Sequence, residues 1–168
     1  MTSKDYVEIL DWSSAIATAT LELDTKSSKK VKKEDAYLYR GIARCFIDDK
    51  EGKHKEAIED LSKAINLYTN ITGANNDEAY YYRAYAFYLD GDYERAIADC
   101  NCKYIITKNL YPYRDELLGK IYYAMGKYEK AVNKFDVVLK YCLTQTPPIY
   151  NCGLLHSYQE ACKRVNSV

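Results

Sequence analysis

Two short segments of the chain nearly repeat one another: Gly91-Asp92-Tyr93-Glu94-Arg95-Ala96-Ile97 and Gly126-Lys127-Tyr128-Glu129-Lys130-Ala131-Val132. A small residue precedes the alanine of each segment by twelve positions, Ala84 in the first case and Gly119 in the second. Residues 37–65 show the same order of residue types over a longer interval. Such recurrence is typical of units that stack side by side, and it favours binding over catalysis.

Apolar residues in these stretches recur at three- and four-residue spacing, as Ala131, Phe135 and Val138 do. This is the period of an amphipathic helix, and no long alternation of the strand type competes with it. Gly91 and Gly126 supply residues that can leave a helix with positive φ. The pattern predicts helices at residues 35–50, 53–70, 77–90, 92–108, 112–125, 127–142 and 148–165.

The N-terminal region contains a weaker copy of the repeating segment. Asp11-Trp12-Ser13-Ser14-Ala15-Ile16 resembles residues 92–97, which predicts a helix over residues 12–23 with residues 3–10 as its short partner. We therefore expect one domain over residues 1–168. Its predicted parts are a truncated helix pair (1–24), a basic linker (25–35), three repeats (36–70, 77–109 and 112–143) and a capping helix (148–165).

These residues resemble the tetratricopeptide repeat, in which an aromatic residue and a small residue of a first helix (helix A) precede Gly-Asp-Tyr-x-x-Ala-Ile at the start of a second (helix B). The second repeat offers Tyr80, Arg83-Ala84, Phe87, Gly91, Tyr93, Ala96 and Cys100, and the third offers Leu118-Gly119, Tyr122, Gly126, Tyr128, Ala131 and Phe135. The first offers Tyr37, Arg40-Gly41, Arg44, Gly52, His54, Ala57, Leu61 and Ala64. The resemblance covers residues 36–143, and it implies an all-α fold, a right-handed α-solenoid of antiparallel helix pairs with a C-terminal capping helix.

The first repeat departs from this pattern because sixteen residues, not twelve, separate Gly41 from Ala57. Four residues make about one helical turn. We therefore expect helix A, and helix B with it, to be one turn longer in this repeat.

The resemblance implies a concave surface made by one face of each helix A. The predicted groove residues are Tyr39, Ile42, Tyr81, Tyr82, Tyr85, Tyr88, Tyr113, Lys120 and Tyr123. The chain has 19 tyrosines, a residue type favoured at recognition surfaces because it buries area with few rotatable bonds. The predicted function is a noncatalytic interaction module that binds a partner peptide or helix, and the alternative is a self-associating subunit of a homo-oligomer or larger complex.

Many relatives hold a C-terminal carboxylate with lysine and asparagine side chains of helix A. Leu38, Tyr39, Ile42 and Tyr82 occupy those positions in this chain, and Lys120 is the one cation nearby. We therefore expect no binding of acidic chaperone tails by that mode.

The composition argues against several other classes of function. Lys plus Arg and Asp plus Glu both number 24, so no global charge attracts nucleic acid. The lysines at 26–33 are then a solvated loop, with nucleic-acid contact as the weaker alternative. No apolar run approaches the ~20 residues of a membrane span, and no secretory signal is visible. We expect a cytoplasmic protein whose six cysteines are reduced.

No residue pattern typical of catalysis is present: there is neither a glycine-rich phosphate loop nor an HExxH sequence. Cys152 and His156 have a spacing that could bind a metal, but zinc needs at least three protein ligands and no second pair accompanies them. Cys100 and Cys102 point to different sides of a helix, and a packed ring is the expectation for His54. The sequence thus predicts no enzyme activity, metal, cofactor or small-molecule substrate.

Overall fold

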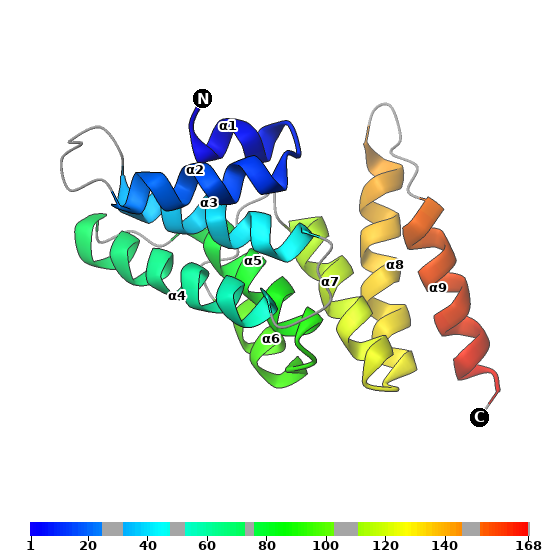
Figure 1. Ribbon diagram of the computed structural model, residues 1–168. Helices are drawn as coiled ribbons and strands as arrows, with labels where there is room; N and C mark the ends of the chain where they lie inside the picture. The colour runs from blue at the N-terminus through cyan, green and yellow to red at the C-terminus, as the bar shows by residue number, and fades with distance from the viewer. Residues whose placement is uncertain (25–31, 48–52, 73–75, 103–110, 146–151, 168) are drawn as a thin grey trace. The chain divides into compact units, whose positions relative to one another are not determined.

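The computed structural model describes residues 1–24, 32–47, 53–72, 76–102, 111–145 and 152–167. Within these ranges the secondary structure is helical, without strands. The helices are α1 (Ser3–Glu8), α2 (Trp12–Asp24), α3 (Lys33–Phe46), α4 (Lys53–Thr72), α5 (Asp77–Leu89), α6 (Tyr93–Cys100), α7 (Tyr111–Ala124), α8 (Tyr128–Thr144) and α9 (Cys152–Val165) (Figure 1). This confirms the predicted all-α fold of helix pairs.

The chain divides into two compact bodies, each considered by itself: the N-terminal body, Met1–Tyr104, and the C-terminal body, Ile105–Val168. In the N-terminal body α1 packs on α2, α3 on α4 and α5 on α6, and α2 and α4 pack on the pairs that follow them. In the C-terminal body α7 packs on α8, and α8 on α9. A continuous array over residues 36–143 would extend across both bodies and stays a prediction.

Three of the helix pairs, α1–α2, α5–α6 and α7–α8, are each joined at a residue in the left-handed backbone region. Gly91 and Gly126 have φ of 81° and 73°, and Leu10 has φ of 60° at the corresponding place between α1 and α2. In all three turns the residue with positive φ donates its N–H to the carbonyl three residues earlier, as Gly91 does to Tyr88 at 3.1 Å. The shared turn geometry supports our interpretation of residues 1–24 as a truncated helix pair.

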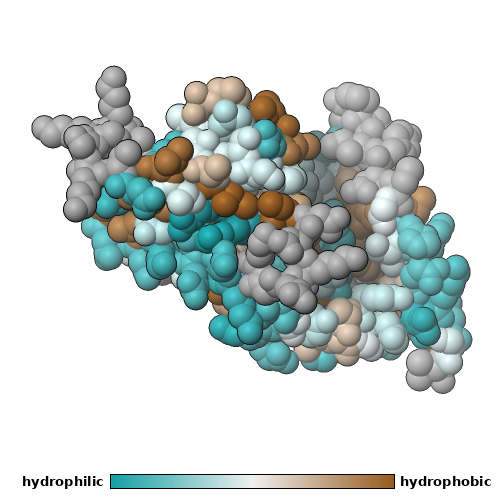
Figure 2. Space-filling model, in the orientation of Figure 1, coloured by the Kyte–Doolittle hydropathy of each residue, from teal (hydrophilic) through white to brown (hydrophobic). Residues whose placement is uncertain are grey.

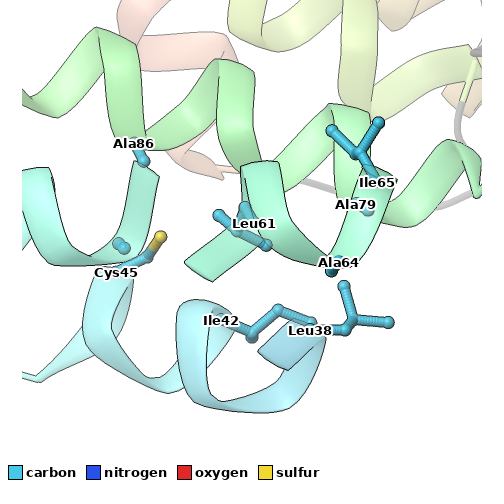
Figure 3. Close-up of a cluster of buried hydrophobic side chains, with 9 residues drawn as sticks. Leu38, Ile42, Cys45, Leu61, Ala64, Ile65, Ala79 and Ala86 are labelled. Atoms are coloured by element: carbon cyan, nitrogen blue, oxygen red, sulfur yellow. The ribbon is translucent and has the colours of Figure 1, made fainter. Parts of the chain in front are cut away.

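The hydrophobic core of the N-terminal body lies between successive helix pairs (Figure 3). Leu38 and Ile42 of α3 pack with Leu61 of α4, and the alanines of α5 complete the same cluster. The buried members are Leu38, Ile42, Cys45, Ala57, Leu61, Ala64, Ile65, Ala79 and Ala86. Because one pair contributes to the core of the next, no pair buries its apolar face alone.

Glycine lets helix A approach helix B closely, as the repeat pattern predicted. A Cβ atom on Gly41 would lie 2.7 Å from Cγ of Leu61, and one on Gly119 would lie 2.6 Å from Cδ1 of Phe135. Real Cβ atoms do not come so near to other heavy atoms. The bulky side chain that faces each glycine therefore leaves no room for a larger residue at that position.

Two predicted helix ends were wrong. Helix α3 ends at Phe46, not at residue 50, because Ile47 is extended with φ of −70° and ψ of 128°. Phe46 lies five residues after Gly41, the same distance as Leu89 after Ala84, so helix A gains no turn. The extra residues of the first repeat follow the helix, and 48–52 lie outside the described residues.

Helix α6 ends at Cys100, although the apolar period predicted a helix to residue 108. Asn101 leaves the helix with φ of −89° and ψ of 1°. Asparagine is a weak helix former because its side chain competes for backbone hydrogen bonds. Residues 103–108 lie outside the described part of the chain.

Candidate partner-binding surface

The A helices α1, α3 and α5 lie side by side in the N-terminal body, since α3 packs against both α1 and α5. Phe46 at the end of α3 stacks between two rings from other helix pairs. Its centroid lies 5.0 Å from that of Trp12 and 5.4 Å from that of Tyr85, with interplanar angles of 23° and 24°. Stacked rings bind their helices together while one edge of each stays at the surface.

More tyrosines of α5 and α6 continue this contact series. Tyr82 meets Phe46 edge-on at 6.0 Å, and Tyr81 meets Tyr82 at 5.1 Å. Tyr88 lies 6.3 Å from both Tyr85 and Tyr93. We call this set the aromatic surface; its members are Trp12, Phe46, Tyr81, Tyr82, Tyr85, Tyr88 and Tyr93.

The aromatic surface is accessible to a partner. Phe46 is 39% exposed, and the tyrosines are half-buried. Figure 2 shows brown hydrophobic residues over α1 and α2, where Ile9, Leu10 and Leu21 are largely exposed. Ile9 and Leu10 precede Trp12 by three and two residues, with Asp11 between, so exposed apolar residues lie close to Trp12 in sequence.

Three members of the aromatic surface, Trp12, Phe46 and Tyr93, were not among the groove residues that the sequence analysis predicted. Phe46 lies seven residues, about two helical turns, after Tyr39 and thus on the same side of α3. Trp12 occupies the position of Tyr93 in its own helix pair. Both signals were present in the repeat pattern, but ring contact across pairs is a property of the packing.

The two predicted groove residues of α3 lie in different environments, one in the core and one partly exposed. Ile42 is 1% exposed and lies in the hydrophobic core, so it is removed from the predicted groove. Tyr39 is half-buried, and burial raises the pKa of its hydroxyl to about 12, with further contributions from the carboxylates of Glu78, Asp35 and Glu8. Tyr39 also lines a hollow of about 260 Å³ with Asp35, Lys4 and Lys32 among its walls.

The groove residues of α7 belong to the C-terminal body. Tyr113 is 56% exposed, whereas the Lys120 ammonium lies 2.7 Å from the Glu116 carboxylate one turn earlier. Tyr123 packs edge-on against Tyr128 at 5.4 Å, and its hydroxyl raises the pKa of the Arg164 guanidinium of α9. Of the three, Tyr113 is the side chain most accessible to another molecule.

An ion pair that the sequence analysis did not identify joins helix A to helix B in each repeat. Arg40 donates to both carboxylate oxygens of Asp60 at 2.8 and 2.9 Å, and also to the Thr20 hydroxyl of the preceding pair at 3.2 Å. Arg83 binds Asp99 at 2.7 and 2.8 Å and the Ser62 hydroxyl at 3.2 Å in the same way. Each arginine therefore bonds to side chains of the helices before and after its own, and so links three successive helices.

The third repeat reverses this ion pair. Asp115 lies on helix A and is 1% exposed, and Lys134 of helix B donates to it at 2.7 Å. Leu118 occupies the position that Arg40 and Arg83 have in the other repeats. The charges have exchanged helices, while an ion pair still joins them.

Groups that could support chemistry are few in the described ranges. No cluster of three His, Cys, Asp or Glu side chains that could hold a metal ion occurs among them, and the Cys152 side chain lies outside them. Burial raises the pKa of the Cys45 thiol to about 12, which disfavours the nucleophilic thiolate. The ring nitrogen Nδ1 of His54 is buried with no hydrogen-bond partner in the described residues.

The structure describes only part of the predicted basic linker. Residues 26–31 of the lysine-rich segment lie outside the described residues, whereas Lys32 and Lys33 are exposed at the start of α3. None of the described helices combines the length and apolar character needed to cross a membrane.

Comparisons with known proteins agree with the repeat geometry. Residues 78–101 and 117–142 match the family model of the tetratricopeptide repeat. A thermophilic TPR protein of Thermus thermophilus, TTC0263, is similar in structure with a TM-score of 0.68 and 14% identity, over 95% of this chain and 77% of that chain. No curated protein sequence matches the chain.

Two structures of the MamA protein are also similar. One has a TM-score of 0.62 and 21% identity over 98% of this chain and 84% of that chain. The other has a TM-score of 0.61 and 19% identity over 99% and 96%, respectively. At these identities the likeness concerns the fold alone.

Proposed function

This chain is a tetratricopeptide repeat protein, and we propose that it binds a peptide or helix of a partner protein on the aromatic surface of its N-terminal body. Repeats of this class form protein-interaction scaffolds. The proposed role is noncatalytic, and it needs no cofactor, small-molecule substrate, nucleic acid or membrane.

The observation that carries this proposal is the set of rings around Phe46. Trp12, Phe46 and Tyr85 come from three helix pairs and stack at 5.0 and 5.4 Å, so their edges are fixed before a partner arrives. Rigid aromatic side chains lose little conformational entropy on binding and are enriched among residues that dominate binding energy. A peptide or helix laid across α3 and α5 would cover these edges with its apolar side chains.

A pull-down comparing wild type with the double variant Tyr82→Ala/Tyr85→Ala tests the proposal. Tyr141→Ala is the matched control, because Tyr141 is a partly exposed tyrosine of α8, in the C-terminal body. We expect partners recovered by the wild type and the control to be lost from the double variant. Circular dichroism must show that the variant keeps its helical signal. Equal recovery by all three proteins would disprove the groove assignment.

A self-associating subunit is the second candidate function. Leu143 and Leu155 are exposed apolar side chains of α8 and α9, and a second copy of the chain would remove them from water. Light scattering at two protein concentrations separates the candidates, since a stable dimer without partner favours self-association. We propose a reducing compartment, the cytoplasm, for either role because Cys45, Cys100 and Cys142 are buried free thiols.

A further inference from the structure

The face made by α1, α3 and α5 has two chemically different halves. The last turns of α3 and α5 carry rings of the aromatic surface, including Phe46 and Tyr88. The first turns of the same helices carry carboxylates: Asp35 on α3, and Asp77 and Glu78 on α5. A segment bound along this face would therefore meet aromatic rings at one end and acids at the other.

Tyr39 shows that acids from three helices converge. Its hydroxyl lies within electrostatic reach of Glu78 on α5, Asp35 on α3 and Glu8 on α1. Besides burial, which is the largest cause, all three raise the pKa of this hydroxyl. Tyr39 and Asp35 also line one hollow together with Lys4 of α1.

The cations near these acids do not balance them. Lys4 pairs with Glu8 at 3.7 Å, and Lys32 lines the same hollow as Asp35. Glu78 forms no ion pair with any residue that the structure describes. Burial, Asp77 and Asp35 raise its pKa, and Lys4 lowers it in part. Among these residues, the carboxylates of Glu8, Asp35, Asp77 and Glu78 thus outnumber the ammonium groups of Lys4 and Lys32. Asp35 also accepts a hydrogen bond from the Tyr68 hydroxyl of α4.

The arginines of α3 and α5 cannot supply the missing charge. Arg40 and Arg44 both bind Asp60, and Arg83 binds Asp99, on the side of these helices that meets helix B. The buried acids on helix B hold these guanidinium groups in place. None of these three guanidinium groups is therefore available to the acids of the outer face.

We propose that the segment bound on this face is basic: a peptide or helix that places lysine or arginine beside Glu78 and Asp35, and apolar side chains on the aromatic surface. This rests on the proposed function and adds the charge of the partner to it. Cations also bind favourably over tyrosine and tryptophan faces, so the rings and the acids select the same ligand chemistry. An acidic segment would instead meet like charges, which cost binding energy at a partly desolvated surface.

Two synthetic peptides of equal length test this inference. Both repeat Leu and Phe at helical spacing, and one carries Lys where the other carries Glu. Trp12 is the only tryptophan of the chain and stacks on Phe46, so its fluorescence reports binding at the aromatic surface. We expect the Lys peptide to bind at least tenfold more tightly than the Glu peptide in low salt, with an affinity that falls as salt is added.

Variants of Glu78 test whether its carboxylate causes the preference for the Lys peptide. Glu78→Gln should weaken binding of the Lys peptide several-fold, and Glu78→Lys should narrow or reverse the preference between the peptides. Asp136→Asn is the matched control because it also removes one carboxylate, which lies in the C-terminal body and pairs with Lys140. This control should bind both peptides as the wild type does.

The outcomes separate the inference from the function on which it rests. Equal affinity for the two peptides, or no change in Glu78→Gln, would overturn the basic partner. If Tyr82→Ala/Tyr85→Ala then weakened both peptides alike, the aromatic surface would stand as a binding site without charge selection. Failure of both peptides to bind would also overturn the basic partner, while the pull-down would still decide the groove assignment.

Discussion

Arg83 on α5 donates two parallel hydrogen bonds to the carboxylate of Asp99 on α6, from Nε to Oδ2 at 2.7 Å and from Nη2 to Oδ1 at 2.8 Å. The side chains are only 20% and 11% exposed, so neither charge is well solvated without the other. Two-point pairing of arginine with a carboxylate fixes geometry as well as energy. This pair holds helix A against helix B in the second repeat.

Removing one partner of this pair should destabilise the protein more than removing both. We expect Asp99→Ala to cost about 3 kcal/mol of unfolding free energy, because a largely buried guanidinium then lacks its carboxylate. Arg83→Leu/Asp99→Leu should cost less, and the third repeat already carries Leu118 at the arginine position. Urea denaturation at neutral pH measures both effects.

The control for this measurement is an exposed ion pair. Lys140 bonds Asp136 one turn away on α8, and Lys140→Ala should leave the urea midpoint unchanged because exposed pairs contribute little. A double variant as unstable as Asp99→Ala would show that the unpaired buried charge is not the cause.

Gly119→Ala should destabilise the C-terminal body by about 2 kcal/mol, the usual cost of overpacking a core. The new Cβ would meet the Phe135 ring, with Cδ1 at 2.6 Å. In the second repeat the facing position holds the smaller Cys100, and Ala84 is accommodated there with no exposed surface. Thermal unfolding followed by circular dichroism gives the change in stability.

Ala84→Gly is the reciprocal control. Glycine costs about 1 kcal/mol relative to alanine inside a helix, so this variant should also lose stability. Helix propensity alone predicts that Gly119→Ala gains stability, and a gain would contradict the close approach of α7 and α8.

Leu10→Gly should stabilise the N-terminal body. Leu10 has φ of 60°, in the left-handed region that costs an ordinary residue about 1 kcal/mol, and Gly91 and Gly126 fill the same turn position elsewhere. Its side chain is 67% exposed, so little packing is lost with it. Leu10→Ala is the control, because it removes the side chain but keeps the unfavourable φ, and it should show no such gain. Equal urea midpoints for the two variants would refute the strain argument.

The helix pairs could be predicted from sequence because their signals are local. The small residue of helix A, the turn glycine and the first alanine of helix B recur at fixed spacing, as Ala84, Gly91 and Ala96 do. The end of α3 could not be predicted in this way. No glycine or proline occurs between Phe46 and Gly52, so the sequence does not distinguish a longer helix from a longer connection.

The ion pairs and the ring contacts depend on how helices are rotated against one another. Asp60 lies 20 residues from Arg40, and Asp99 lies 16 from Arg83, so only packing brings them together. Both aspartates do come three residues after the first alanine of helix B, a regularity visible in the sequence. Ile42 was assigned to the groove from the family resemblance, whereas the packing of α3 places it in the core.

The pH dependence of stability should reveal the raised pKa of the Tyr39 hydroxyl, which burial raises most and nearby carboxylates raise further. Its pKa is raised from 10.0 to about 12, so the hydroxyl stays protonated in the folded state while the unfolded chain begins to ionise near pH 10. The unfolded state then binds fewer protons, and stability falls as the pH rises from 10 to 12. Below pH 10 both states are protonated, and this group causes no change.

Urea unfolding between about pH 9 and 11.5 tests this, with Tyr39→Phe compared with the wild type. Phenylalanine keeps the ring but cannot ionise, so the variant should lose less stability over the same interval. Tyr113→Phe, which alters an exposed tyrosine of the C-terminal body, is the control and should follow the wild type. Parallel curves for Tyr39→Phe and the wild type would mean that neither burial nor the carboxylates of Glu78, Asp35 and Glu8 raise the pKa of this hydroxyl, which would remove one support of the argument for a basic partner.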